Sequence, residues 1–127
     1  MSFNWADFLT LADALLREPN SPGPEEASLR SAISRAYYAA FHVARNFGRD
    51  RGEFTPTETG QDHWLVKHHF ISSLDRTHRK IGLDLDRLYD YRTSADYDDV
   101  LAGRPIPLAQ SSVAVARNVL NALNSLE

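Results

Sequence analysis

Residues 25–47 read EEASLRSAISRAYYAAFHVARNF and carry the longest apolar pattern in the chain. Apolar side chains recur there every three or four residues, as on one helix face: Leu29, Ile33, Ala36, Tyr37, Ala40, Phe41, Ala44 and Phe47. The pattern predicts a helix about 35 Å long, at ~1.5 Å per residue. Because its alanines allow neighbouring helices to approach closely, we expect this helix to be the spine of a bundle and to end at Gly48.

Shorter helical patterns flank this spine. Asn4 and Asp7 have the spacing of a capped start, which predicts a helix over residues 4–17. Thr59 and Asp62 have the same spacing and are predicted to open a third helix, with its end near residue 75. The apolar positions of that helix include Trp64, Leu65, Ile71 and Leu74. A fourth helix is predicted over about 81–95, and a last helix from about Ser112 to the carboxyl end.

The connections between these patterns are rich in proline and glycine. We expect loops at about 18–24 and 48–60, and a break at Gly103-Arg-Pro-Ile-Pro107. No segment alternates strictly between apolar and polar residues, so no sheet is expected. The sequence therefore predicts an all-α, up-and-down bundle of four or five helices, with residues 1–127 forming a single domain.

The composition excludes several classes of protein. The 127 residues contain no cysteine, which excludes a disulfide framework, a thiolate zinc site and a cysteine nucleophile. No apolar run reaches the roughly 18 residues of a membrane span, and the amino end lacks the pattern of a signal peptide. We therefore expect a cytoplasmic protein that does not enter a membrane.

The histidines and glycines do not indicate a metal or a cofactor. His63, His68, His69 and His78 are separated by five, one and nine residues, and none of these spacings is the i, i+4 pair of a helical zinc site. The chain contains neither a phosphate-binding glycine loop nor a Gly-x-Ser-x-Gly elbow. We therefore expect no metal and no cofactor.

Polar residues form a second stripe along the long helix. Arg35, Tyr38, His42, Arg45 and Arg49 follow one another at helical spacing, roughly opposite the apolar face. Arginine, tyrosine and histidine together offer phosphate binding, base stacking and proton transfer. The alternative is an ordinary solvated face, although Tyr38 and His42 suggest that a partner helix or a second copy covers it. The net charge of −3 argues against indiscriminate nucleic-acid binding, but not against a confined anion site.

A second polar position lies on the fourth predicted helix. Arg92 shares a face with Leu85 and Leu88, and a buried arginine is costly unless it is paired. Asp96 follows four residues later, at salt-bridge spacing. Two interpretations remain open: a structural Arg92–Asp96 pair, or an arginine that binds phosphate at a cleft or dimer seam with Tyr97 beside it.

Two motifs together resemble a known family. Ser34-Arg-Ala-Tyr-Tyr-Ala-Ala-Phe-His-Val-Ala-Arg45 and Arg92-Thr-Ser-Ala-Asp-Tyr97 look like the HEPN superfamily, in particular its prokaryotic branch with Arg-Ala-Tyr-Tyr-Ala-x-Phe-His and Arg-x-x-Ala-Asp-Tyr signatures. His63 also matches that branch in position, and the resemblance extends from about Leu29 to the carboxyl end. It implies a helical bundle that forms a homodimer.

The resemblance also implies a function. Many relatives are metal-independent ribonucleases, often toxins encoded beside a minimal nucleotidyltransferase antitoxin. Their site combines an arginine, which Arg92 matches, with a histidine four to six residues later. This chain departs from that pattern, because Asp96 stands there and aspartate, ordinarily ionised near neutral pH, is a poor general acid. His42 or His63 would have to move the proton from another helix, with Arg92 and Arg35 stabilising the phosphorane.

Three functions remain open at this stage. The first is an RNA-directed, toxin-like protein whose candidate catalytic residues are Arg92, Asp96 and His42 and whose candidate binding residues are Arg35, Tyr38, Arg45 and Tyr97. The second is a non-catalytic module that binds a nucleotide or nucleic acid through the same arginines. The third is an interaction module in which the arginine stripe meets the aspartate-rich segment 84–99 of a second copy or of another protein.

Overall fold

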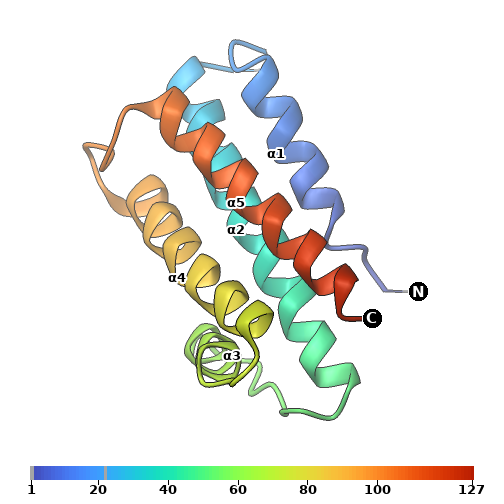
Figure 1. The fold of residues 1–127 in the computed structure, drawn as a ribbon. Helices are drawn as coiled ribbons and strands as arrows, with labels where there is room; N and C mark the ends of the chain where they lie inside the picture. The colour runs from blue at the N-terminus through green and yellow to red at the C-terminus, as the bar shows by residue number, and fades with distance from the viewer. Residues whose placement is uncertain (1, 22) are drawn as a thin grey trace.

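The computed structural model describes residues 2–21 and 23–127, and these form five helices (Figure 1). The helices are α1 (Asp7–Arg17), α2 (Glu25–Asp50), α3 (Asp62–Ile71), α4 (Arg76–Tyr97) and α5 (Pro105–Ser125). The described residues contain no strand. The all-α bundle expected from the sequence is confirmed.

The helix α2 is the spine of the bundle, as its length and apolar pattern predict. Among the described helices, it alone packs against all four others. Figure 1 shows α1, α2, α4 and α5 alternating in direction, while the short α3 crosses the bundle and is seen end-on. The helix α3 packs mainly on α4. One end of the bundle therefore has α3 lying beside α2 and α4.

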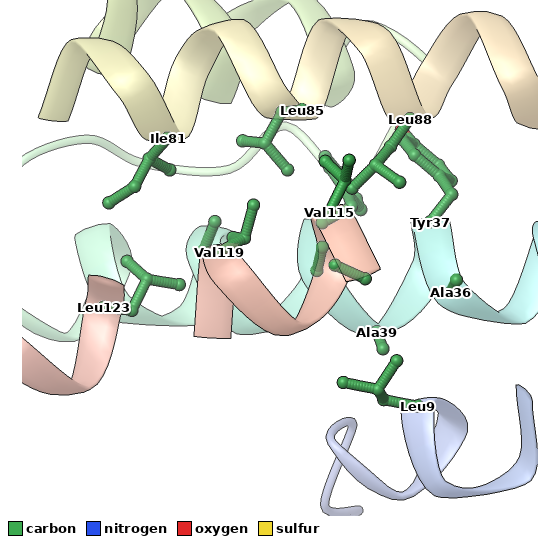
Figure 2. Packing of buried hydrophobic residues seen from close by; sticks show 14 of the residues in the cluster. Leu9, Ala36, Tyr37, Ala39, Ile81, Leu85, Leu88, Val115, Val119 and Leu123 are labelled. Carbon is green, nitrogen blue, oxygen red and sulfur yellow. The ribbon is translucent and has the colours of Figure 1, made fainter. Parts of the chain in front are cut away.

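The core lies where α2, α4 and α5 meet. Figure 2 shows Ile81, Leu85 and Leu88 of α4 facing Val115, Val119 and Leu123 of α5, with α2 beside them. All six side chains are buried, as are Ala32, Ala36, Ala39, Ala40 and Ala44 of α2. At about 25 cal/mol per Å² of apolar surface, this burial is the main stabilisation of the bundle.

Two helix ends differ from the sequence predictions. Gly48 does not end α2, which continues to Asp50. Gly48 is buried, and a Cβ added there would overlap the ring of Phe54, so the glycine serves close packing and not termination. At the amino end, α1 begins at Asp7 and not at Asn4, because Asn4 Oδ1 accepts a hydrogen bond from the Ala6 amide in a turn that precedes the helix.

The predictions for α3 and its neighbours also need correction. Thr59 does not cap α3: its hydroxyl accepts from the Gln61 amide, and α3 ends at Ile71. Trp64 and Leu74 are 59% and 96% exposed, so Val66 and Phe70 form the buried face instead. The helices α4 and α5 are both longer than predicted, since Asp75 caps α4 through the His78 amide and Pro105 begins α5. Within the described ranges, no helix is long and apolar enough to cross a membrane.

Candidate functional site

A pocket of about 310 Å³ lies between α2, α4 and the start of α3. Aromatic rings make up much of its wall, and we call it the tyrosine pocket. It is lined by Tyr37, Tyr38, Phe41 and His42 of α2, Thr59 and Gly60 of the preceding loop, His63 of α3, and Tyr89 and Arg92 of α4.

Arg92 reaches this pocket surrounded by aromatic rings. Its side chain is 11% exposed, and its Cζ atom lies 5.0–5.8 Å from the ring centroids of four tyrosines: Tyr37, Tyr38, Tyr89 and Tyr97. These distances are within the range of cation–π attraction. The Nη1 atom lies 3.6 Å from Asp96 Oδ2, whereas the buried Nε has no hydrogen-bond partner. The guanidinium is therefore held in place with part of its donor capacity unused.

His63 opens onto the same pocket from α3. Its Nδ1 atom lies 2.9 Å from the Tyr37 hydroxyl, and its ring stacks on Tyr89 with 3.8 Å between the centroids. Burial lowers the pKa of His63 to about 4, with the positive charges of Lys67 and Arg92 adding to this effect against the opposing charge of Asp86. The ring is therefore neutral at pH 7. Its buried Nε2 has no partner.

His42 is the second histidine of the pocket. Trp5 stacks on it with 3.7 Å between centroids, and Tyr38 lies parallel to it at 6.0 Å. Burial, together with the charge of Arg45, lowers the pKa of His42 to about 4. Its buried Nδ1 also has no partner.

The three unpartnered nitrogens of Arg92, His63 and His42 all belong to residues that line the tyrosine pocket. A buried polar atom without a partner costs about 1–3 kcal/mol, so such atoms are uncommon unless a ligand or water satisfies them. Burial also raises the pKa of Tyr37, which keeps its hydroxyl protonated. The pocket thus combines one fixed positive charge, two neutral imidazoles and aromatic walls. This set can bind a phosphate, stack a planar ring and accept a proton.

The structure brings only some of the predicted site residues to this pocket. Arg92, His42 and Tyr38 line it. Asp96 and Tyr97 approach Arg92, but Asp96 also accepts a hydrogen bond from Ser34 and Tyr97 is largely exposed.

The two remaining candidates, Arg35 and Arg45, lie on the polar stripe of α2 outside the tyrosine pocket. The Arg35 guanidinium sits 4.7 Å from the Phe8 ring centroid and lines a different hollow, together with Asp96. Arg45 donates to Asn46 and lowers the pKa of His42 by its charge. The tyrosine pocket thus takes Tyr38 and His42 from the stripe, while Arg35 lines another hollow and Arg45 lines neither.

From the sequence, a partner helix or a second copy was expected to cover the stripe, but the covering segment was not identified. Part of it is covered within the chain, because Trp5 and Phe8 lie on His42 and Arg35. Sequence reasoning also placed Tyr37 on the apolar face of the long helix, and it named neither Tyr37 nor Tyr89 as a site residue. Their hydroxyls were the available signal, since a buried tyrosine usually needs a polar partner.

The other histidines of this region do not form a metal site. No group of three or more His, Asp or Glu side chains in residues 2–21 and 23–127 is arranged to hold a metal ion.

No protein-family model, curated protein or solved structure matches the chain. The chemistry of the tyrosine pocket, beside the two motifs that resemble the HEPN superfamily, is therefore the guide to function.

Proposed function

We propose that this protein is a HEPN-like, RNA-directed protein that holds one nucleotide of a single-stranded RNA in the tyrosine pocket. The observation that carries the proposal is the presence of three unpartnered nitrogens, on Arg92, His63 and His42, around one pocket. In this proposal, Arg92 binds the phosphate and the aromatic walls stack the base.

The physical character of the pocket supports a nucleotide as ligand. Arginine presents several donors in a planar fork that matches phosphate oxygens. Tyrosine and histidine faces stack on nucleobases with ~1–3 kcal/mol per base. A volume of about 310 Å³ suits one small ligand and not a folded partner. With a net charge of −3, attraction to RNA must come from such a local site.

The test is direct binding of an unstructured RNA oligonucleotide and of a mononucleotide, measured by fluorescence anisotropy at two salt concentrations. We expect Arg92→Ala to weaken both by at least about tenfold and to reduce the salt dependence, because a phosphate contact is lost. Arg104→Ala, at an exposed position away from the pocket, is the matched control and should bind as the wild type does. Equal binding by both variants would contradict the proposal.

RNA cleavage without a metal is a second candidate function, favoured by the neutral imidazole of His63 beside Arg92. If His63 Nδ1–H donates to the Tyr37 oxygen, Nε2 carries a free lone pair. It could take the proton from a ribose 2′-hydroxyl while the 2′-oxygen attacks the phosphorus, with Arg92 stabilising the added negative charge. The bond to the 5′-oxygen then breaks, and that oxygen takes a proton from water.

Cleavage would leave a 2′,3′-cyclic phosphate and a 5′-hydroxyl. The measurement is incubation of unstructured RNA in EDTA, followed by analysis of the ends. We expect His63→Gln to abolish cleavage while it weakens binding much less than Arg92→Ala does. RNA that stays intact at high protein concentration would reject this candidate and leave the binding function, which is the non-catalytic alternative.

The partners implied by the resemblance complete the proposal. We propose a toxin-like homodimer that works with a minimal nucleotidyltransferase as antitoxin. Sedimentation should give twice the monomer mass of 14.3 kDa. An adjacent gene for such a nucleotidyltransferase, and neutralisation of toxicity on co-expression, would support the pairing. A protein-interaction module would instead assemble without binding either RNA or nucleotide.

A further inference from the structure

A second pocket lies along α3, beside the loop that precedes this helix. It has a volume of about 530 Å³ and is lined by Glu53, Phe54, Trp64, Leu65, His68, His69, Ser72, Ser73 and His78. We call it the Trp64 pocket. The Trp64 ring is 59% exposed and packs on His68 with 4.1 Å between centroids. A large aromatic ring that is this exposed provides a flat surface for a ligand.

Two of the three histidines that line the Trp64 pocket contact carboxylates, while the third, His68, packs on Trp64. His69 Nε2 lies 2.8 Å from Glu53 Oε1, and His78 Nδ1 lies 2.8 Å from Asp75 Oδ2. Phe54 and Phe70 pack against these two histidine rings. The pocket therefore offers aromatic faces and little unpaired charge, so it suits a planar, uncharged ring better than a phosphate.

The Trp64 pocket adjoins the tyrosine pocket through α3. His63 lines one pocket and Trp64 lines the other. Consecutive Cα atoms are ~3.8 Å apart, and their side chains diverge by ~100° around a helix. The loop before α3 also borders both, since Phe54 lines the Trp64 pocket and Gly60 the tyrosine pocket. The two pockets are thus lined by adjacent residues of α3 and by the same preceding loop.

We propose that the Trp64 pocket is a second stacking subsite, which receives a neighbouring nucleobase of the RNA strand bound in the tyrosine pocket. This inference rests on the proposed RNA function. The occupant is a base and not a phosphate, because the exposed surface is aromatic, two of the lining histidines contact carboxylates, and no lysine or arginine lines the pocket. Stacking needs no fixed hydrogen-bond pattern, so this subsite increases affinity for a strand without selecting its sequence.

The test compares a mononucleotide with an unstructured RNA tetranucleotide, since only the longer ligand can fill both pockets. We expect Trp64→Ala to weaken tetranucleotide binding by about tenfold and to leave mononucleotide binding unchanged. Trp64→Phe should keep most of the affinity, because phenylalanine still stacks. Leu83→Ala is the control, since Leu83 is an exposed apolar residue of α4 that does not line either pocket.

The outcomes separate this inference from the proposed function. If Trp64→Ala binds the tetranucleotide as the wild type does, or weakens both ligands equally, the second subsite is wrong while the tyrosine pocket stands on the Arg92→Ala result. If the wild type binds neither ligand, both proposals are overturned. Thermal unfolding of each variant checks that it is folded, which we expect for a change at an exposed ring.

Discussion

Asp62 and His63 are consecutive residues in the first turn of α3, and each belongs to a different buried polar cluster. Asp62 is only 4% exposed, and its carboxylate accepts hydrogen bonds from the Thr57 amide, the Thr57 hydroxyl and the Glu58 amide. In the tyrosine pocket, by contrast, His63 and Arg92 each keep a buried nitrogen without a partner. One cluster has its hydrogen bonds made within the chain, and the other does not.

This difference separates the structural role of Asp62 from the binding role proposed for the tyrosine pocket. The Asp62 carboxylate fixes the loop before α3, including Glu58, whose φ of +61° is unusual for a residue other than glycine. Burial raises the pKa of Asp62, but the bonds from Thr57 and Glu58 and the charge of Arg45 lower it further than burial raises it. Its interactions stabilise the charged form and leave nothing for a ligand to add. The buried nitrogens of the tyrosine pocket, by contrast, have no hydrogen-bond partner within the chain.

The comparison is tested most strongly by Asp62→Ala. Loss of a buried carboxylate that accepts three hydrogen bonds should reduce the free energy of unfolding by about 3 kcal/mol, because the amides of Thr57 and Glu58 lose their acceptor. Urea denaturation measures this change. Asp86→Ala is the control: Asp86 pairs with Lys67 at 3.2 Å near the surface, so its loss should cost less than ~1 kcal/mol. Equal losses in the two variants would remove the distinction.

The residues of α2 and α4 explain why the fold was predictable from sequence. Their apolar side chains recur at helical spacing, and packing of that pattern determines the bundle. The end of α2 was not predictable, because Gly48 has the local character of a helix stop. Only the approach of the Phe54 ring, a tertiary contact, shows its actual role.

The tyrosine pocket was predictable only in part, for a related reason. Arg92 stood out because it is a charge on an apolar face, and His42 because it interrupts a stripe of arginines. The participation of Tyr37 and Tyr89 depends on contacts between helices, such as the hydrogen bond between Tyr37 and His63. Spacing within one helix carries no information about which rings a different helix will bring to it.

Acidification should destabilise the protein through the two histidines of the pocket. The pKa values of His42 and His63 are about 4 in the folded protein and ~6.5 when unfolded, so the unfolded chain binds more protons between these values. Stability is therefore fully present above about pH 6.5 and falls as the pH decreases toward 4. Allowing for solvent screening of these half-buried rings, we expect a loss of about 2 kcal/mol between pH 7 and pH 5.

The measurement is thermal or urea unfolding across this pH range. A double variant, His42→Gln with His63→Gln, cannot take up the two protons and should show a shallower pH dependence than the wild type. The same dependence in both proteins would mean that neither ring is held neutral by the fold. His68→Gln, at an exposed position of α3, controls for the change of residue type.

The smallest effect on stability is expected at Arg92, where the contrast with Arg30 is sharpest. Arg30 donates hydrogen bonds to the carbonyl oxygens of Ala95, Asp98 and Asp99 and so holds the end of α4. Arg30→Met should therefore lower the free energy of unfolding by about 1–2 kcal/mol. Arg92→Met should change the free energy of unfolding by less than ~1 kcal/mol. Its guanidinium is desolvated with Nε unpartnered, the pairing with Asp96 is long, and methionine can fill the space between the tyrosines. An Arg92→Met protein as destabilised as Arg30→Met would mean that the fold needs Arg92, and the unpartnered nitrogen would no longer favour a ligand.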